Sequence, residues 1–402
     1  MAEELADQPK GVAEELAGTE FVFSEEQGQL RAAVRKFCAD HVDESAVRGW
    51  MASDPPFDAA VWARLGTELG VLGMAVPEAE GGAGGSLVDQ AVAVEQLGAA
   101  LACGPLFGTV YLAIPALVAA SGASDLLGPL VEGTRTAAFA VADDAGAFDP
   151  ASVAVEAVRA DDGWALSGRV ERVVDAGAAD VLLVAANSAD GVGLYAVESN
   201  SVGVQRIPLT TLDLTRPQAT VELSDAPAQL VAGSEEAERV ISHALHVGGA
   251  LLAVEQVGAA QHLLDLSVEY AKNRLQFGRP IGSFQAVKHR LADDLVALEH
   301  ARSTAFHAVW ALTDGSDDPA LAVSIAQATC SAAFVRVATD AIQVHGGIGF
   351  TWEHQAHLYY KRAYTDAALL GSAEQHRARV AEFVLDVAPE RDAPRVATGM
   401  PS

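Results

Sequence analysis

The feature that most constrains the fold is a double change in the spacing of apolar residues along the chain. Up to about residue 132 they recur at helical intervals. Between Thr136 and about Leu230, short β-branched runs alternate with turn residues, which predicts a small antiparallel β domain. The helical period then returns over four long segments, at about 235–272, 284–313, 318–345 and 354–387. This order predicts an α+β multidomain protein made of a helical domain, a β domain and a C-terminal four-helix bundle.

The domain boundaries are expected where the spacing changes. The expected segments are a flexible tail (1–20), an N-terminal helical domain (21–132), a β domain (133–233), a four-helix bundle (234–387) and a second flexible tail (388–402). Within them, Ser24–Gln27 has the pattern of a capping box at a helix start. Asp161–Gly163 and Asp190–Gly191 carry the Asp-Gly signal of hairpin turns.

Composition excludes several classes of function. The 402 residues include 54 acidic and 26 basic ones, a net charge of −28, which argues against a nucleic-acid partner. The three cysteines lie far apart without metal-ligand spacing, so we expect reduced thiols and no metal site. The first residues lack the basic region of a secretory signal, and no unbroken apolar run reaches the roughly 18–20 residues of a membrane span. These observations predict a soluble, cytoplasmic protein.

Two motifs in the last third of the chain indicate a binding site. In Tyr270–Asp293 one helix ends and another begins, and Arg274, Phe277 and Gln285 stand on the two sides of the turn. A guanidinium, an aromatic face and an amide at such a corner suit a diphosphate joined to a flat ring. About sixty residues later, Gln343–Phe350 contains clustered glycines that let backbone N–H groups approach a phosphate closely.

In this order and at this separation the two motifs resemble those of the acyl-CoA dehydrogenase family, and the resemblance extends from about residue 21 to 387. It implies that family's fold, with a barrel-like middle domain. It implies FAD as cofactor and the α,β-dehydrogenation of an acyl-CoA thioester, in lipid or steroid side-chain β-oxidation. It also implies a homotetramer or dimer of dimers, with an electron-transferring flavoprotein as the usual acceptor. The residues that would bind the ADP half of an FAD seated in a neighbouring subunit are Arg274, Phe277, Gln285, Gln343, Gly346 and Gly347.

The other half of the family's flavin site differs in this chain. Where the family has a Glu-Pro-Gly-Ala-Gly-Ser-Asp run, this chain has Asp143–Asp149. Where the family places an aromatic ring and a hydroxyl beside the isoalloxazine, Gly168–Asp175 carries Arg172 and Val174. Each lost contact is worth ~1 kcal/mol. The resemblance therefore predicts an incomplete isoalloxazine site in this chain.

The catalytic base of the family is also missing from both of its usual places. The glutamate position beyond the glycine motif is Leu370, and the alternative position in the first bundle helix reads Gly248–Gly249. Glu255, which interrupts the apolar run 247–257, is the remaining candidate. A carboxyl on an apolar helix face is expected to have a raised pKa, which suits a general base. The other interpretation of Glu255 is a hydrogen-bonding residue between helices.

Other polar residues have an alternative structural interpretation. Glu374 and His376–Arg377 follow a Gly-Ser turn and either contact the cofactor or lie on a helix surface. Trp352–His354 and His357 form an aromatic and titratable group, for which packing and capping are favoured over metal binding. Glu95 lies on the helix that borders the acyl pocket in the family, or makes a surface salt bridge.

Two functional hypotheses follow. In the first, the chain is an FAD-dependent acyl-CoA dehydrogenase with an unusual base. In the second, it is a base-lacking partner subunit of a heteromeric acyl-CoA dehydrogenase, and it completes the FAD site of its partner. The second hypothesis rests on a resemblance to actinobacterial members that form α2β2 assemblies.

Overall fold

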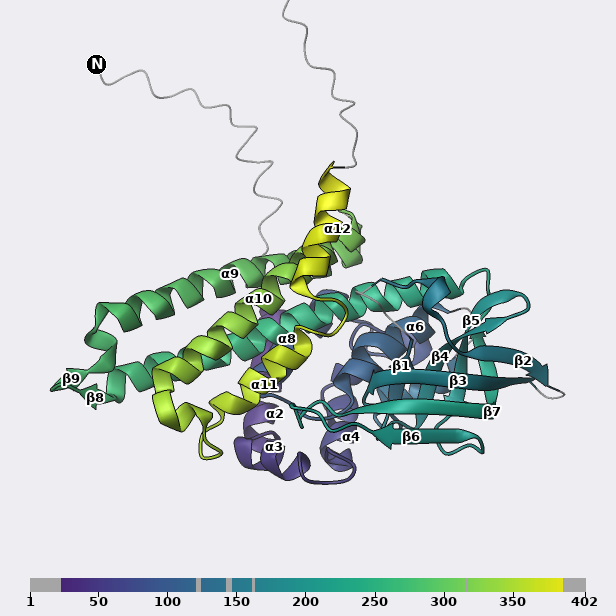
Figure 1. Cartoon of the computed structure of the whole chain (residues 1–402), viewed down its shortest axis with the longest axis horizontal. Helices are drawn as coiled ribbons and strands as arrows, with labels where there is room; N and C mark the ends of the chain where they lie inside the picture. The colour runs from purple at the N-terminus through teal and green to yellow at the C-terminus, as the bar shows by residue number, and fades with distance from the viewer. Residues whose placement is uncertain (1–22, 121–123, 142–146, 161–162, 316, 386–402) are drawn as a thin grey trace, which may run out of the picture.

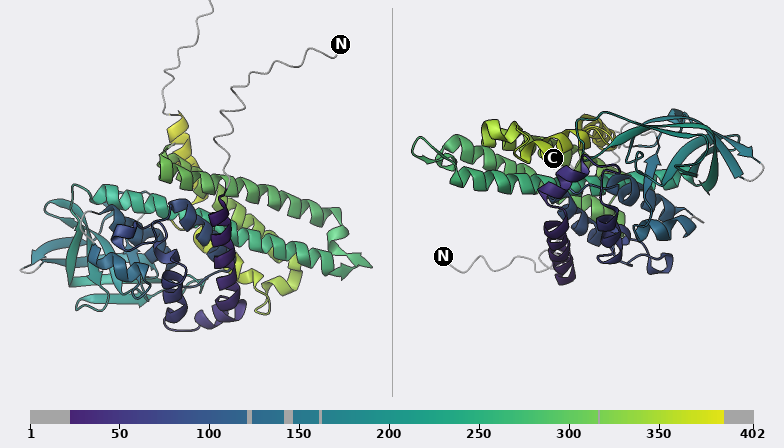
Figure 2. Two further views of the ribbon diagram at one scale, coloured as in Figure 1. Left: turned by 180° about the vertical axis from the view of Figure 1, so that it is seen from behind. Right: turned by 90° about the horizontal axis from the view of Figure 1, so that it is seen from below.

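A computed structural model of the chain describes residues 23–120, 124–141, 147–160, 163–315 and 317–385. The order of helical domain, β domain and helical bundle is confirmed. Figure 1 shows an elongated molecule with the sheet at one end and the long bundle helices reaching the other. The views from behind and from below place the N-terminal helices along one side of the bundle (Figure 2). The two expected tails lie outside the described residues, and the exact division into domains stays a prediction.

The N-terminal domain consists of short helices that begin at polar caps. Ser24 and Gln27 form the expected capping box, with the Ser24 hydroxyl accepting from the backbone of Gln27. Val34 and Phe37 of the first helix are buried. The elements are α2 (Glu25–His41), α3 (Glu44–Trp50), α4 (Ala59–Thr67), η1 (Val71–Gly73), η2 (Glu78–Glu80), α5 (Leu87–Ala99), the π-helix η3 (Leu106–Ala113), α6 (Ile114–Ala119) and α7 (Ser124–Val131).

The middle domain is a sheet that closes on itself. Strand β4 pairs with both β2 and β5, and β3 and β7 complete the ring, which confirms the barrel-like arrangement. Most pairings are antiparallel as expected, but β1–β4 and β2–β4 are parallel, a difference that no local turn signal could reveal. The strands are β1 (Ala137–Ala140), β2 (Glu156–Ala160), β3 (Gly163–Val174), β4 (Val181–Ser188), β5 (Gly191–Glu198), β6 (Val204–Pro208) and β7 (Gln218–Ala232), with a 3-10 turn η4 (Pro150–Ser152) before β2.

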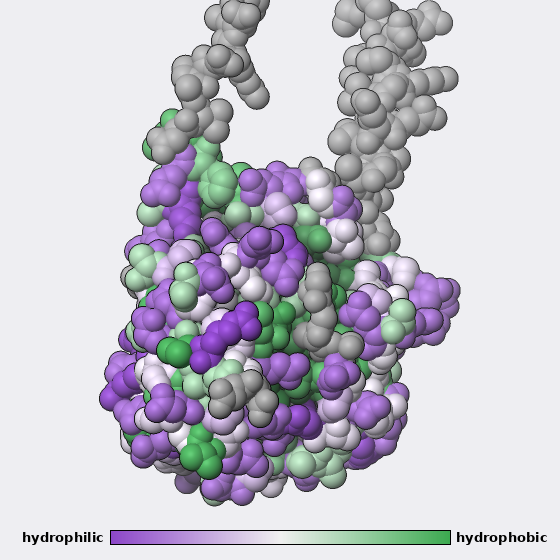
Figure 3. Space-filling view, turned by 90° about the vertical axis from the view of Figure 1, so that its right-hand side faces the viewer, coloured by the Kyte–Doolittle hydropathy of each residue, from purple (hydrophilic) through white to green (hydrophobic). Residues whose placement is uncertain are grey.

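The surface at the sheet end of the molecule is mixed in character. Figure 3 shows mainly hydrophilic side chains there, with hydrophobic ones gathered in the middle of that face.

Of the two expected hairpin turns, the one at Asp190–Gly191 joins antiparallel β4 and β5. In the other, Asp161 and Asp162 lie outside the described residues, although Ala160 pairs with Gly163 across it.

The C-terminal domain differs from the expectation at its last helix. The predicted single helix over 354–387 is wrong, because the chain breaks at Leu370 and Gly371, whose φ angles of 55° and 102° a right-handed helix cannot contain. Two shorter helices result. The elements are α8 (Ala237–Asn273), the hairpin β8 (Leu275–Gln276) and β9 (Arg279–Pro280), η5 (Ile281–Ser283), α9 (Gln285–Asp314), α10 (Pro319–His345), η6 (Gly346–Phe350), α11 (Ala356–Asp366) and α12 (Ala373–Leu385).

Close packing of α5 against α8 joins the first and last domains. A Cβ on Gly258 would lie 1.9 Å from the Glu95 carbonyl oxygen, and one on Gly98 would lie 2.3 Å from that of Glu255. Both contacts require glycine, so the two backbones approach each other directly. The α8 and α10 regions are also long and apolar enough to cross a bilayer, but 83% and 61% of their apolar windows are buried inside the protein. Their composition is therefore explained by the core that they form.

Candidate functional site

The predicted ADP-binding corner lies at the end of the bundle farthest from the sheet (Figure 1). Arg274 caps the C-terminus of α8 and begins the β8–β9 hairpin, and its guanidinium makes no hydrogen bond or ion pair with the described residues. Phe277 is 90% exposed and has a φ of 53°, a conformation rare for a bulky side chain and often associated with functional sites. Gln285 opens α9 on the other side of the turn. The corner thus presents a free cation, an aromatic ring and an amide to solvent.

The glycine motif ends the neighbouring helix α10. Gly346 terminates it with a φ of 64°, a left-handed conformation that glycine adopts without strain. Gln343, Gly346 and Gly347 are all exposed, and no atom lies within 4 Å of a Cβ built on either glycine. Their backbone is therefore accessible to a ligand or partner, as the FAD prediction requires.

A row of rings anchors this motif to the bundle. The ring of His345 lies 4.5 Å from that of Tyr270 and 4.3 Å from that of His354. His354 Nδ1 accepts a hydrogen bond from the Ala356 backbone at 3.1 Å, and Trp352 contacts the His357 ring at 4.7 Å. These contacts are of the packing and capping kind that the sequence favoured for Trp352–His354 and His357. Among the described residues, no group of three or more His, Cys, Asp or Glu could hold a metal.

A cavity of about 810 Å³, the inter-domain cavity, lies where the sheet meets α11 and the turn before α12. Its walls bring together three of the positions at which the chain departs from the family: Arg172, Val174 and Leu370. These three positions therefore lie around one space. The only carboxylate among its described lining residues is Glu171, which is exposed and paired with Arg169 at 3.0 Å. The Asp143–Asp149 run lies partly outside the described residues.

One histidine supports the wall at Leu370. His376 is buried, and its Nε2 donates to the Leu370 carbonyl at 2.8 Å, while Glu374 and Arg377 lie exposed and pair at 3.5 Å. Burial lowers the pKa of His376 to about 4. The buried imidazole of His376 therefore helps to hold the Leu370 backbone in this wall.

This arrangement predicts a loss of stability in mild acid. Between pH 6.5 and about 4 the unfolded chain binds a proton at His376 that the folded chain does not, so the free energy of unfolding falls as the pH falls. Denaturant unfolding at several pH values should show this slope, and His376→Gln should reduce it. His289→Gln, on an exposed side chain of α9, is the control that should leave the slope unchanged. An identical slope in His376→Gln would contradict the prediction.

Glu255 lies in a fully buried ion cluster. Its carboxylate accepts hydrogen bonds from Arg216 at 2.6 and 2.7 Å, from Arg362 at 2.6 Å and from the Tyr111 hydroxyl at 2.8 Å. Arg216 also pairs with Asp366 at 2.8 Å. Together with Asp213, which binds Arg362 at 3.0 Å, these residues connect α8, η3, α11 and the loop before β7.

The expectation of a raised pKa for Glu255 is wrong. Burial alone would raise it, but the two arginines outweigh burial and lower the pKa to about 2. Glu255 is 2% exposed and is not among the residues that line the inter-domain cavity. The sequence could not reveal this cluster, because its arginines lie 39 and 107 residues away. Catalysis by Glu255 stays a prediction, and the geometry favours the interhelical role.

The alternative base position has no room for a carboxylate. A Cβ on Gly248 would lie 2.5 Å from Leu112 Cδ2, and one on Gly249 would lie 2.7 Å from Val323 Cγ1. A glutamate at either position would displace the side chains that pack there.

Two family models match the chain: the acyl-CoA dehydrogenase C-terminal domain over residues 238–385 and the N-terminal domain over residues 24–125. Acyl-CoA dehydrogenase IpdE2 of Mycobacterium tuberculosis is 36% identical over 353 residues, which cover 87% of this chain and 95% of IpdE2. The chain belongs to the acyl-CoA dehydrogenase family. The predicted family, the FAD cofactor and the oxidoreductase class are thereby confirmed.

Solved structures of the family share the whole fold. A variant of the Tcur3481–Tcur3483 steroid ACAD matches with a TM-score of 0.81 and 31% identity, covering 90% of this chain and 98% of that one. The ChsE4–ChsE5 complex from Mycobacterium tuberculosis matches with a TM-score of 0.82 and 28% identity, covering 92% of this chain and all of that one. The short-chain specific acyl-CoA dehydrogenase of Homo sapiens is 27% identical over 350 residues, covering 82% of this chain and 83% of the human protein.

Proposed function

We propose that this acyl-CoA dehydrogenase chain works in a heteromeric assembly, where its bundle corner holds the ADP half of an FAD whose ring lies in a partner chain. One observation carries the proposal. Leu245 lines the inter-domain cavity and Arg274 forms the corner, and the two lie about 40 Å apart along α8 at 1.5 Å per residue. A single dinucleotide cannot bridge that distance. A dinucleotide held at this corner would therefore have its ring in a neighbouring subunit, outside this chain's own inter-domain cavity.

The residues of the corner fit an ADP group. Arg274 offers charge-assisted hydrogen bonds to a phosphate, and the glycine backbone offers further donors. Phe277 supplies an aromatic wall. Bound FAD supplies the hydride acceptor of the family reaction, and this chain's residues bind and orient its diphosphate.

The inter-domain cavity does not offer the matching chemistry for the reactive ring. Arg172 and Val174 replace the stacking ring and the hydroxyl of the family, and Leu370 cannot accept a proton. The carboxylate that removes the substrate α proton must lie within hydrogen-bond reach of that carbon. No described lining residue except the rim carboxylate Glu171 could serve. This favours a partner chain that supplies the base.

The names of the relatives support two more specific proposals, one about the assembly and one about the substrate. The ChsE4–ChsE5 complex has two kinds of chain, and the Tcur3481–Tcur3483 protein is called a steroid ACAD. We propose an α2β2 assembly that oxidises the acyl-CoA side chain of a steroid or another lipid in the cytoplasm. An electron-transferring flavoprotein is the proposed acceptor.

A self-sufficient enzyme is the second candidate, favoured by the retention of a cavity large enough for a ligand. Co-expression with the family member encoded nearest to this gene distinguishes the two. The proposed assembly should elute as one yellow complex with dehydrogenase activity, whereas this chain alone should be colourless. A yellow, active chain carrying one FAD without any partner would contradict the proposal.

A further inference from the structure

The predicted ADP-binding corner is assembled from three helices, whose ends must keep a fixed spacing if they are to hold one ligand. Arg274 follows α8, Gln285 opens α9, and Gly346 ends α10. The rings of Tyr270 and His345 lie 4.5 Å apart and join α8 to α10 beside the corner. The position of α9 relative to α10 needs a separate explanation.

The first turns of α9 have little apolar packing. No side chain in the range 285–293 is buried, and Leu291 packs against the core only in part. The first buried residue of α9 is an acidic one, Asp294, which is 1% exposed. Hydrophobic packing, which supplies most of the stability of helices in proteins, therefore holds this end of α9 only weakly.

Two crossed ion pairs, the α9–α10 ion pairs, join this end of α9 to α10. Arg290 of α9 pairs with Asp340 of α10, and Arg336 of α10 pairs with Asp294 of α9 at 3.2 Å. Arg336 also lies 3.5 Å from the exposed Asp293. The two arginines are half-exposed, but the side chains of Asp340 and Asp294 are only 13% and 1% exposed. These pairs are therefore less screened by solvent than ordinary surface salt bridges.

The two ion pairs act as one unit, because their acids lie close to each other. Burial and the neighbouring charge of Asp340 raise the pKa of Asp294. In mildly acidic buffer this raised pKa limits the repulsion between the two carboxyl groups, while the attraction to the arginines remains. The α9–α10 ion pairs therefore draw the two helices together.

These ion pairs lie close to the residues predicted to contact the cofactor. Arg290 follows Gln285 by about 7.5 Å along α9, and Asp340 precedes Gln343 by about 4.5 Å along α10, at about 1.5 Å per residue. A change in the spacing of the helices at the ion pairs therefore moves Gln285 relative to the glycine motif.

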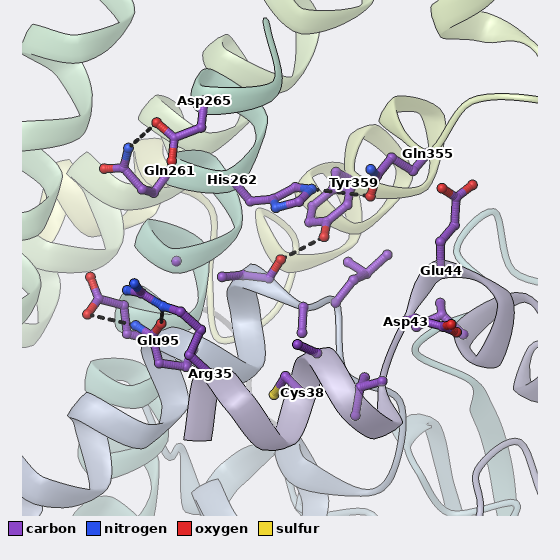
Figure 4. Close-up of a pocket in the computed structure, with 18 of the residues that line it drawn as sticks. Arg35, Cys38, Asp43, Glu44, Glu95, Gln261, His262, Asp265, Gln355 and Tyr359 are labelled. Carbon is purple, nitrogen blue, oxygen red and sulfur yellow. Dashed lines mark hydrogen bonds between the residues drawn. The ribbon is translucent and has the colours of Figure 1, made fainter. Parts of the chain in front are cut away.

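Farther along, α9 is anchored by a different ion pair. Glu95 of α5 is 5% exposed and pairs with Arg302 of α9 and, at 3.1 Å, with Arg31, so the alternative of a surface salt bridge at Glu95 is wrong. Figure 4 shows Glu95 in the wall of a cavity of about 860 Å³ between the N-terminal helices and the bundle. Arg302 lies about 18 Å from Arg290 along α9. The Glu95 pair therefore stabilises the fold away from the corner.

We propose that the α9–α10 ion pairs position the cofactor, because they hold Gln285 and the glycine motif at the spacing that an ADP group requires. This inference rests on the proposed function, since it assumes that the corner binds the ADP half of FAD. The four residues do not touch the ligand and act through the spacing of the two helices.

Asp340→Ala gives the sharpest test, because two mechanisms predict opposite signs. Loss of the helix spacing should weaken FAD binding by the assembly about five-fold, whereas the loss of a negative charge near the diphosphate would by itself strengthen it. Fluorescence titration of the flavin-depleted assembly with FAD at pH 6 measures the affinity. Unchanged or tighter binding by Asp340→Ala would overturn the proposal.

Variants of Arg290 complete a double-mutant cycle. Arg290→Gln should weaken FAD binding by a factor similar to that of Asp340→Ala, and the double variant should bind no more weakly than either single variant. Arg290→Lys keeps the charge and should retain most of the affinity. Arg290 is half-exposed, so Arg290→Gln and Arg290→Lys remain informative where Asp340→Ala does not fold.

Arg302→Gln is the matched control. It removes the same charge from the same helix and breaks the pair with Glu95, so it should lower the melting temperature of the chain and leave the FAD affinity unchanged. An equal loss of FAD affinity in Arg302→Gln and Arg290→Gln would show general destabilisation and overturn the proposal.

Arg274→Ala separates a failure of this proposal from a failure of the proposed function. If Arg274→Ala loses FAD while Arg290→Gln and Asp340→Ala bind it normally, only the proposal for the ion pairs falls. If Arg274→Ala also retains full FAD affinity, the corner does not bind FAD and both proposals fall.

Discussion

Glu255→Gln is expected to lower the free energy of unfolding by about 3–5 kcal/mol, because it leaves two buried arginines short of a counter-charge. Arg216 and Arg362 both donate to this carboxylate, and the side chains of all three residues are at most 4% exposed. A glutamine offers one oxygen in place of two and no charge. Denaturant unfolding monitored by circular dichroism at pH 6 measures the change.

Asp366→Asn is the matched control within the same cluster. Burial raises the pKa of Asp366, and its Oδ2 has no hydrogen-bond partner among the described residues, so this carboxyl is less well satisfied than that of Glu255, which accepts from two arginines and Tyr111. The substitution should therefore cost much less than Glu255→Gln. Equal costs would contradict the assignment of charges in the cluster.

The same experiment tests Glu255 as a base. A base touches the substrate and can be replaced with little effect on stability, so a fully stable Glu255→Gln variant whose assembly loses turnover would restore the catalytic prediction. The structural role has its own pH signature. The pKa of Glu255 is lowered from 4.5 to about 2, so its contribution is complete above pH 4.5 and is lost as the pH falls toward 2.

Arg274→Ala is expected to weaken FAD binding by the assembly about 10- to 100-fold, which corresponds to one charge-assisted contact to a phosphate. The FAD content after dialysis and the fluorescence of released flavin measure the loss. Arg274 is exposed and its side chain has no partner among the described residues, so the melting temperature of this chain alone should not change.

Lys272→Ala is the control for charge at the same helix end. Lys272 lies two residues earlier, is exposed and pairs with Glu269 at 2.6 Å. It should leave the FAD content unchanged, since it lies outside the predicted motif. Full FAD retention in Arg274→Ala would remove the corner from the cofactor site, and with it the proposed assembly.

Much of the fold could be predicted because its signals are local. Helical and strand spacing depend on neighbouring residues, and the Ser24–Gln27 cap and the Asp190–Gly191 turn are formed within four residues of sequence. The prediction of a single helix over 354–387 was wrong, and the cause is also local. Apolar spacing continues through Leu370 and Gly371, while their left-handed backbone breaks the helix.

The predicted ADP-binding corner and the candidate base Glu255 differ in the same way. Arg274, Phe277 and the Gln343–Gly347 segment stand at helix ends, so the sequence by itself placed them on an exposed corner. The role of Glu255 depended on the tertiary structure. A carboxyl on an apolar helix face has a raised pKa only when nothing charged packs against it, and here two arginines from other segments do. The sequence determined the elements and the family, whereas long-range packing decided the charge state of the core.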